Sequence, residues 1–278
     1  MLVNVQKAVK MFFSNSSFEM IYNEALANAL DADANEIRIH ISLPDPTQLQ
    51  NLQLVILDNG VGFDDYRFGK FSKLFDVEEQ THKGLGRLVY LCYFERVYVE
   101  SIYNEGNQKR TFTFDEGFNG ENTVETIETC PCGSSLTMCG FTGERLHRND
   151  NINPNQIKSL LMKNFYMRLY KKKLNNERIR VIIESCVGGN QVEAIVDTDD
   201  MPDFSILSLE HRLDLFSSVD LYYSVRETNE VGKKTITAIA VDDRCHQVAI
   251  IDDENLPVGY EMIFFVDIRI ISRCYRRS

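Results

Sequence analysis

From Glu24 to Ala32 the chain reads E-A-L-A-N-A-L-D-A, and this stretch says more about the molecule than any other. Steps of four and three residues place Glu24, Asn28 and Asp31 on one face of a helix that we predict over residues 18–32. The rest of this helix is rich in Ala, Leu, Met and Ile, so we expect most of it to be buried. A buried carboxylate and a buried amide are costly unless they are paired, which indicates a site. For Glu24 and Asp31 alone, a solvated polar stripe is the alternative.

A glycine-rich segment follows a strand that we predict over residues 51–57, and it reads D-N-G-V-G-F from Asp58 to Phe63. Asp-Asn-Gly is a turn signal, so a plain hairpin is the simplest interpretation. The residues after Gly62 do not alternate between apolar and polar, so the returning strand of a hairpin is missing. A carboxylate followed by Gly60 and Gly62 instead suits a backbone that a ligand approaches closely.

A third segment reads K-G-L-G-R from Lys83 to Arg87 and precedes an apolar stretch, residues 88–94, that we predict to be helical. Glycines that open a helix leave backbone N–H groups free to face a phosphate, and the helix dipole adds positive charge. The segment is neither a Walker loop nor a Rossmann fingerprint, and an ordinary loop is the alternative.

In this order, the three segments resemble the sequence boxes of the Bergerat-fold (GHKL) ATPase superfamily, which includes gyrase B, the heat-shock ninety chaperones, MutL and the histidine kinases. The helical box E-x-x-x-N-x-x-D-A matches Glu24–Ala32, and the box D-x-G-x-G matches Asp58 to Gly62. A weaker fourth box, G-T-x-V-x-V, is similar to residues 133–138, with serine at position 134 in place of threonine. The resemblance covers residues 15–142 and is strongest to the MutL, heat-shock ninety and MORC-like branch.

The resemblance implies an α+β fold in which residues 1–147 form a Bergerat-fold α/β sandwich, a mixed sheet covered by helices. From residue 148 the pattern changes to a predicted helix over 154–170 followed by strands. The predicted strands of this part are 178–184, 191–196, 219–226, 234–241 and 261–268. This order resembles the transducer domain of MutL and gyrase B, so we expect a smaller transducer-like α+β domain over residues 148–278. Any other α+β domain is the alternative, and the basic end at Ser278 could be a tail or a cut through a longer protein.

The resemblance also assigns roles to single residues. Glu24 would orient and deprotonate the attacking water, and Asn28 would ligate Mg²⁺ through its side-chain oxygen. Asp58 would accept a hydrogen bond from the adenine amino group and so select ATP over GTP. Asp31 could equally be a structural residue at the helix end. The expected nucleotide contacts are Asn28, Asp31, Asp58, Gly60, Gly62, Lys83, Gly84, Leu85, Gly86, Arg87 and Ser134.

Taken together, these roles imply a Mg²⁺-dependent ATPase that works as a conformational switch. ATP would close a mobile lid over residues 64–86 and clamp two copies into a homodimer, with residues 1–13 reaching across, and slow hydrolysis would release them. By the same resemblance we expect a prokaryotic genome-maintenance or phage-defence (antiviral) role, with a protein or DNA client that the residues do not identify. The γ-phosphate lysine of this family would be Lys233, Lys234 or a residue beyond the chain end.

Two other functional classes compete with the switch. A pseudo-ATPase, a nucleotide-binding module that switches partner binding without turnover, is disfavoured because both Glu24 and Asn28 are present. A histidine kinase is disfavoured because too few residues precede the first helix to hold a phosphoacceptor helix pair. His40 lies in a predicted strand and does not supply the exposed phosphoacceptor.

Composition limits the location and the partners of the protein. In 278 residues, 44% of them hydrophobic, there is no apolar run long enough to cross a membrane and no signal-peptide pattern, so we expect a cytoplasmic protein. A net charge of −11 argues against general affinity for nucleic acid. Seven irregularly spaced cysteines fit a reducing compartment. Cys130, Cys132, Cys139 and His147 could suggest zinc, but their spacing does not match the usual ligand pattern.

Overall fold

The computed structural model describes residues 16–72, 86–142, 149–209, 216–227, 234–241, 244–252 and 256–270. The chain divides into two compact units, one of Met1–Leu160 with Ile179–Val196 and one of Leu161–Arg178 with Asp197–Ser278. The division therefore falls inside a single long helix, α4 (Pro154–Leu174). Here the structure differs from the boundary that we drew after residue 147.

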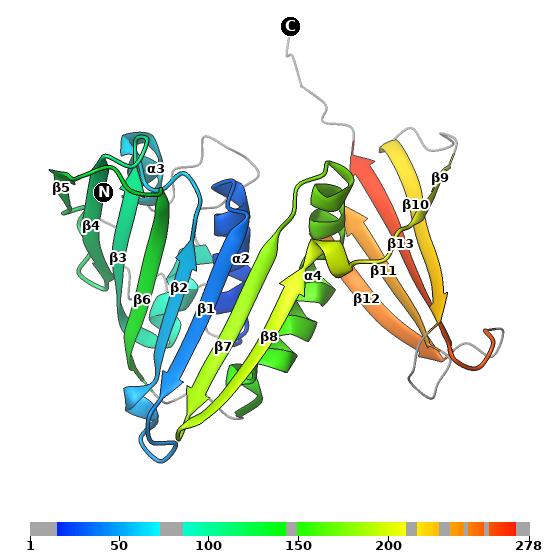
Figure 1. Ribbon diagram of the computed structural model, residues 1–278, viewed down its shortest axis with the longest axis horizontal. Helices are drawn as coiled ribbons and strands as arrows, with labels where there is room; N and C mark the ends of the chain where they lie inside the picture. The colour runs from blue at the N-terminus through cyan, green and yellow to red at the C-terminus, as the bar shows by residue number, and fades with distance from the viewer. Residues whose placement is uncertain are drawn as a thin grey trace, which may run out of the picture. The chain divides into compact units, whose positions relative to one another are not determined.

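The first unit is built on an eight-stranded sheet in the order β5-β4-β3-β6-β2-β1-β7-β8 (Figure 1). Strand β1 pairs in parallel with β7, whereas the pairs β1–β2, β2–β6, β6–β3, β3–β4 and β4–β5 are antiparallel. The sheet is thus mixed, and the predicted α+β sandwich is confirmed. Its strands are β1 (Glu36–Leu43), β2 (Gln53–Asp58), β3 (Phe94–Tyr103), β4 (Gln108–Asp115), β5 (Thr123–Thr126), β6 (Gly133–Phe141), β7 (Arg180–Val187) and β8 (Asn190–Asp197).

The hairpin β7–β8 explains why the division between the two units differs from the boundary that we drew after residue 147. We predicted both strands and the turn between them, and Gly188 and Gly189 do form that turn with φ of 56° and 83°, which suits glycine. The strand β7, however, pairs along its whole length with β1, from Glu36 opposite Arg180 to Leu43 opposite Val187. Its residues Val181 and Ile183 are fully buried, so the hairpin completes the first sheet.

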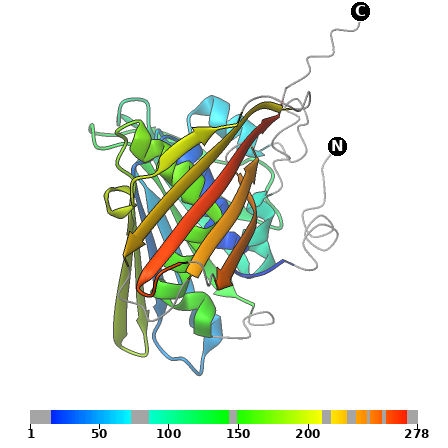
Figure 2. The ribbon, with the colours of Figure 1, turned by 90° about the vertical axis from the view of Figure 1, so that its right-hand side faces the viewer.

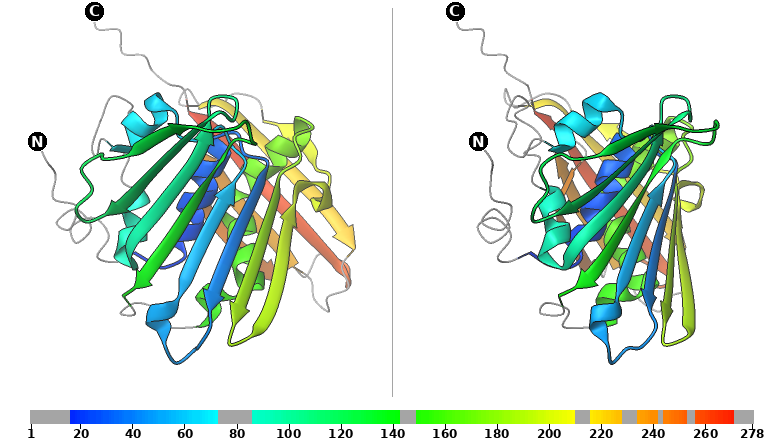
Figure 3. Two further views of the ribbon diagram at one scale, coloured as in Figure 1. Left: turned by 60° about the vertical axis from the view of Figure 1, so that its left-hand side comes forward. Right: turned by 90° about the vertical axis from the view of Figure 1, so that its left-hand side faces the viewer.

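The helix α2 (Met20–Asp31) lies along one face of this sheet (Figures 1 and 3). Six of its residues are buried, at the helical spacing that the sequence indicated: Ile21, Tyr22, Ala25, Leu26, Ala29 and Leu30. They meet the apolar side of the central strands, where β1 alternates strictly and buries Ile37, Ile39 and Ile41. This packing fixes the orientation of the opposite, polar side of α2.

Two segments next to the sheet differ from our predictions. The stretch predicted as a helix over 88–94 is a 3-10 helix, η2 (Gly86–Cys92), and the strand β3 begins two residues later. A short apolar run does not distinguish a helix from a buried strand, and this one is divided between the two. Two more short 3-10 helices, η1 (Leu49–Asn51) and η3 (Asn149–Ile152), belong to the same unit.

The beginning of the predicted lid is also ordered, as helix α3 (Asp65–Ser72). The rings of Phe68 and Phe71 lie 5.1 and 5.2 Å from that of Phe112 on β4. Arg110, only 3% exposed, donates to the carbonyl oxygens of Phe63 and Asp64 at 3.0 and 2.8 Å. Because aromatic packing and a buried guanidinium hold this segment, residues 65–72 do not belong to a mobile lid. The rest of the predicted lid, residues 73–85, lies outside the described residues.

The second unit holds a five-stranded sheet in the order β12-β11-β13-β10-β9. Its strands are β9 (Ser205–Ser208), β10 (Phe216–Glu227), β11 (Lys234–Val241), β12 (Arg244–Asp252) and β13 (Tyr260–Ile270). The predictions of strands over 219–226, 234–241 and 261–268 are confirmed, whereas β9 and β12 were missed. The C-terminal half of α4 packs on this sheet, with Tyr166 stacked 4.7 Å from Phe265. No helix in the described part of the chain is long and apolar enough to span a membrane.

Candidate functional site

The polar side of α2 carries Glu24 and Asn28 as an interacting pair. The Asn28 Nδ2 atom donates to Glu24 Oε1 at 3.1 Å, across one helical turn. Glu24 is half-buried, whereas Asn28 and Asp31 are exposed. Of the three polar residues that we expected to be buried on this helix, only Glu24 is partly buried. Since the nitrogen of Asn28 serves Glu24, its oxygen is the atom left for a ligand, and an amide oxygen is a ligand that Mg²⁺ accepts.

Gly86 brings the third sequence box against the first. A Cβ atom at this position would lie 2.0 Å from Glu24 Oε2 and 2.4 Å from Oε1. Only a residue without a side chain therefore lets the backbone at the start of η2 approach this carboxylate so closely. The other lid residues that we predicted as phosphate contacts, Lys83, Gly84 and Leu85, lie outside the described residues.

Arg87 is a buried cation. It is 8% exposed, and its guanidinium carbon lies 4.7 Å from the centre of the Phe71 ring. Burial lowers the pKa of Arg87 to about 10, and the nearby Glu24 carboxylate counteracts part of that effect. Arg87 is therefore an electrostatic neighbour of Glu24, and Phe71 of α3 lies against its guanidinium.

Tyr90, one turn further along η2, is a buried residue that the sequence did not single out. It is 1% exposed, and its hydroxyl makes no hydrogen bond that meets strict geometric criteria within the described part of the chain. Burial raises the pKa of this hydroxyl well above its ordinary value, and Glu24 raises it further, while the Asn28 side chain and Arg87 act in the opposite direction. Asp58 also raises this pKa. Tyr90 thus lies between the first two sequence boxes.

Asp58 ends β2 as a carboxylate that is largely removed from water. Its Oδ1 atom accepts a hydrogen bond from the Gly60 backbone N–H at 2.8 Å. Burial raises the pKa of Asp58 from 3.8 to about 6, although backbone hydrogen bonds from Gly60 and Ser134 lower it in part. Ser134 lies directly opposite Asp58 in the β2–β6 pairing, so the second and fourth boxes meet here. A carboxylate with such a shifted pKa is typical of functional sites.

The two glycines of the second box, Gly60 and Gly62, lie so close to the backbone of other segments that a side chain would not fit. A Cβ at Gly60 would lie 2.6 Å from the carbonyl oxygen of Ala32, and one at Gly62, where φ is 75°, would lie 2.4 Å from that of Ile102. The Val61 N–H also donates to the Ala32 carbonyl at 3.0 Å. The small Ala32 at the end of the first box and the glycines of the second are therefore parts of one backbone junction.

Ser101 on β3 is a second buried residue that sequence reasoning missed. It is 1% exposed, accepts a hydrogen bond from the Phe63 N–H at 2.8 Å, and lies 3.1 Å from the Ser134 hydroxyl. The chain of contacts from Ser134 through Ser101 to Phe63 fixes the loop that leaves Asp58. A serine on the apolar side of a strand was the available signal, but β3 itself had not been predicted.

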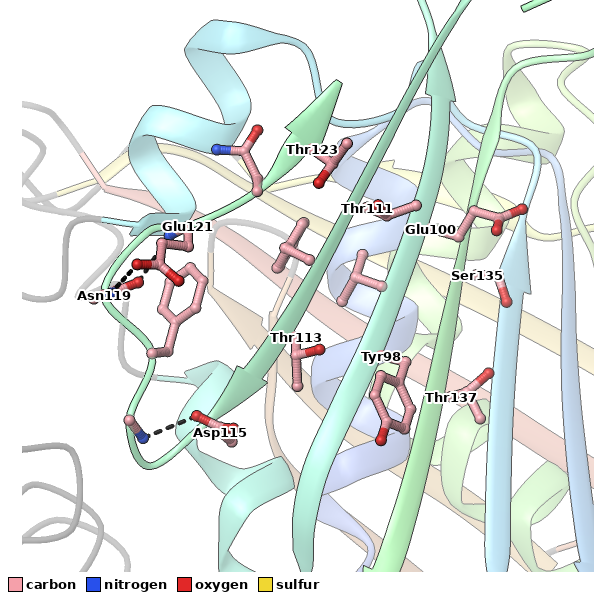
Figure 4. Close-up of a pocket in the computed structure, with 15 residues that line it drawn as sticks. Tyr98, Glu100, Thr111, Thr113, Asp115, Asn119, Glu121, Thr123, Ser135 and Thr137 are labelled. Atoms are coloured by element: carbon pink, nitrogen blue, oxygen red, sulfur yellow. Dashed lines mark hydrogen bonds between the residues drawn. The ribbon is translucent and has the colours of Figure 1, made fainter. Parts of the chain in front are cut away.

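Two cavities lie in the described part of the first unit, and one of them touches the site at Gly60. One, of about 900 Å³, lies over β3, β4 and β6 and is lined by side chains such as Tyr98, Thr111 and Thr137 (Figure 4). None of the predicted site residues lines it. Another, of about 770 Å³, includes Gly60 among its lining residues. Within the described residues, no group of three or more His, Cys, Asp or Glu side chains could hold a metal ion, and His147 lies outside them.

The fold of the first unit is a mixed α/β sandwich, and its sequence places it in a known family. Residues 16–139 match the family model described as histidine kinase-, DNA gyrase B-, and HSP90-like ATPase. This segment is therefore a domain of that family, the Bergerat-fold (GHKL) ATPases, whose members bind ATP. No curated protein sequence matches the chain.

Among solved structures, the N-terminal domain of a DNA repair protein is similar, with a TM-score of 0.57 and 12% identity over 96% of this chain and 87% of that one. At this identity the likeness shows a shared fold. Two structures of the Aquifex aeolicus MutL ATPase domain also match with 11% identity. A mutant form gives a TM-score of 0.46 and covers 90% and 89% of the two chains, and a complex with ADP gives 0.45 and 91% of each.

Replacing Asp58 with asparagine is expected to stabilise the fold in a pH-dependent way. Because the folded pKa of about 6 is higher than the ordinary 3.8, the native carboxyl binds its proton more tightly than the unfolded one. The contribution of Asp58 to wild-type stability should therefore fall as pH rises from about 4 to 6, by up to roughly 2–3 kcal/mol. The gain from Asp58→Asn should be small at pH 4, grow over this window and stay constant above it. Urea unfolding at several pH values measures it, with exposed Asp33→Asn as the control. If Asp58→Asn raised the free energy of unfolding equally at all pH values, the raised pKa of Asp58 would be contradicted.

Proposed function

We propose that this protein binds ATP with Mg²⁺ and hydrolyses it slowly, using Glu24, Asn28 and Gly86 as the centre of the site. The observation that supports this most is the contact between Gly86 and the Glu24 carboxylate, which joins the helical box to the start of the glycine-rich box. Membership of residues 16–139 in an ATPase family supports the same reading.

Glu24 is the residue that we assign to the chemistry. In hydrolysis a water oxygen attacks the γ-phosphorus, the bond to the β–γ bridging oxygen breaks, and the water proton moves to the Glu24 carboxylate. The hydrogen bond from Asn28 Nδ2 fixes one carboxylate oxygen, Oε1, and so orients the base. Mg²⁺ held by the Asn28 oxygen would neutralise phosphate charge. Gly84 to Gly86, with Lys83, would complete the phosphate contacts with backbone N–H groups.

Asp58 is the residue that we assign to the adenine base. With a pKa of about 6 it is mostly ionised at neutral pH, so it offers an acceptor to the adenine amino group. The guanine carbonyl at the same position would face a carboxylate. The variant Asp58→Asn should therefore lose discrimination between ATP and GTP, by about 1.5–3 kcal/mol for one charge-assisted hydrogen bond.

Gly86→Ala tests the central contact separately from the fold. The added Cβ would collide with the far end of a flexible side chain, so we expect Glu24 to rotate away rather than the protein to unfold. ATP hydrolysis should fall by about 10²-fold or more because the base is displaced, while the unfolding temperature changes little.

Gly69→Ala is the matched control for this change. Gly69 lies in α3, and a Cβ there would meet nothing within 4 Å. This variant should keep full activity and gain up to about 1 kcal/mol from helix propensity. If Gly86→Ala also retained wild-type turnover, the contact with Glu24 would have no part in catalysis.

We further propose that the ATPase acts as a nucleotide-driven clamp. Residues beyond α3, from 73 to 86, would close over the γ-phosphate and complete a homodimer surface, with a transducer-like role for the second unit. The fold shared with the N-terminal domain of a DNA repair protein supports a MutL-like or MORC-like genome-maintenance or phage-defence role.

Light scattering with and without a non-hydrolysable ATP analogue, together with ATP turnover with and without DNA, tests the clamp. We expect analogue-dependent dimers and measurable phosphate release. A chain that stays monomeric with the analogue contradicts the clamp, and binding without any turnover favours a pseudo-ATPase.

A further inference from the structure

The sheet of the second unit has one face that α4 covers and one that it does not. Tyr222 and Phe265 lie on the covered face, 6.0 and 4.7 Å from the rings of Tyr170 and Tyr166 of α4. Lys171 of the same helix pairs with Asp267 at 2.5 Å. Because side chains alternate along a strand, the neighbours of these residues on β10 and β13 point to the opposite face. We call that opposite side the outer face (Figure 2).

The outer face carries three successive apolar pairs across its two longest strands, and Glu227 opposite Tyr260 ends this row. Between β10 and β13, Leu221 lies opposite Val266, Tyr223 opposite Phe264, and Val225 opposite Met262. The apolar residues of these strands are thus concentrated on the outer face, whereas the alternate positions toward α4 include charged residues such as Glu261 and Asp267.

The same surface continues onto the neighbouring strands. Leu207 of β9 lies opposite Leu221, and Ile239 of β11 lies beside Val266. The exposed fractions are 53% for Val225, 52% for Leu207, and 40% for both Tyr223 and Ile239. Ser205 and Thr237 flank the centre of this row, beside Tyr223 and Phe264. An exposed apolar surface with small polar residues at its sides is a feature of interaction sites.

The size of the outer face fits a protein interface. With about 3.3 Å of rise per residue and 4.8 Å between strands, the five strands give a face of roughly 700 Å². A stable interface buries about 800 Å² on each partner. The sheet face alone thus comes close to the area that holds two chains together.

The charge of the outer face and of the whole chain helps to identify the molecule that binds this face. Nucleic acid requires a basic surface, and among the described side chains at the β10–β13 pairs of the outer face the charged one is the acidic Glu227. Two copies of a chain with a net charge of −11 repel each other overall, so an apolar row is a surface where they meet at low electrostatic cost. Two copies of an apolar sheet face can pack against each other about 10 Å apart around a two-fold axis.

We propose that the outer face binds the outer face of a second copy of this chain, forming a two-fold symmetric dimer in the absence of nucleotide. The proposal does not depend on the ATP site. It differs from the clamp in surface and in nucleotide requirement, so the two dimers are separable by experiment.

Sedimentation equilibrium of the full chain without nucleotide, over the micromolar range, tests the proposal. We expect a dimer for the wild type and a dissociation constant raised at least about a hundredfold for Val225→Lys, because two charges then meet in an apolar interface. Val192→Lys is the matched control, since Val192 is a strand valine of β8 in the other unit with 41% exposure. That variant should dimerise like the wild type.

Folding is checked by circular dichroism and thermal unfolding, and Val225→Thr provides a milder change that keeps the branched shape of valine. It should weaken the dimer to an intermediate degree. A wild type that stays monomeric overturns the proposal, and strong binding of a hydrophobic dye to that monomer would assign the outer face to another partner. A dimer that persists in folded Val225→Lys, or that appears only with an ATP analogue, overturns it as well.

Discussion

Glu24→Gln is expected to bind ATP as the wild type does and to hydrolyse it about 10²–10⁴ times more slowly. Glutamine has nearly the same shape, so it still fits against Gly86 and still accepts the hydrogen bond from Asn28 Nδ2 through its amide oxygen. It cannot take a proton from water, because a neutral amide is not a base at this pH. Phosphate release under single-turnover conditions measures the chemical step, and calorimetry measures the affinity for ATP.

Glu19→Gln is the control for this substitution. Glu19 is exposed and immediately precedes the same helix, so its loss removes an equal charge without touching Gly86 or Asn28. It should leave turnover unchanged. Wild-type turnover in Glu24→Gln would place the base elsewhere and remove the main support for the chemistry proposed for α2.

Asn28→Ala is expected to abolish Mg²⁺-dependent ATP binding, with a loss well above the tenfold change that corresponds to about 1.4 kcal/mol. The alanine removes the only side-chain oxygen that we assign to the cation, and it also releases Glu24 from its hydrogen bond at 3.1 Å. Titration calorimetry with Mg²⁺ and again with a chelator separates the metal-dependent part of the affinity.

Asn28→Asp serves as the conservative comparison for this site. An aspartate retains a hard oxygen ligand, so it should restore Mg²⁺-dependent binding at least in part. If Asn28→Ala bound ATP within about threefold of the wild type, well under that tenfold step, the metal role would be wrong.

Local patterns were sufficient to predict the elements that carry the site. The helix α2 follows from apolar residues at three- and four-residue spacing, and β2, β6 and α4 follow from equally local signals. The approach of Gly86 to Glu24 was implied only by family resemblance, because nothing in either segment by itself specifies which other segment it meets.

Local patterns could not identify residues whose contacts depend on the register between neighbouring strands. Ser101 is important because β3 places it next to Ser134, and Arg110 because β4 places it under the loop at Phe63. The same holds for the helix α3, whose formation depends on phenylalanines from distant strands as much as on its own sequence. Sequence spacing reports contacts within one element, whereas these contacts join several.

The pairing of β1 with β7 has a consequence for how the first unit can form. Strand β1 is synthesised early, but its partner on one side, β7, follows only after β2 to β6 and the whole of α4. Until then, β1 presents an open row of N–H and C=O groups beside the buried Ile37, Ile39 and Ile41, which is a template for pairing with another chain. The step that closes the sheet has a high contact order, so the nascent chain passes through an aggregation-sensitive period before the nucleotide site gains its full support.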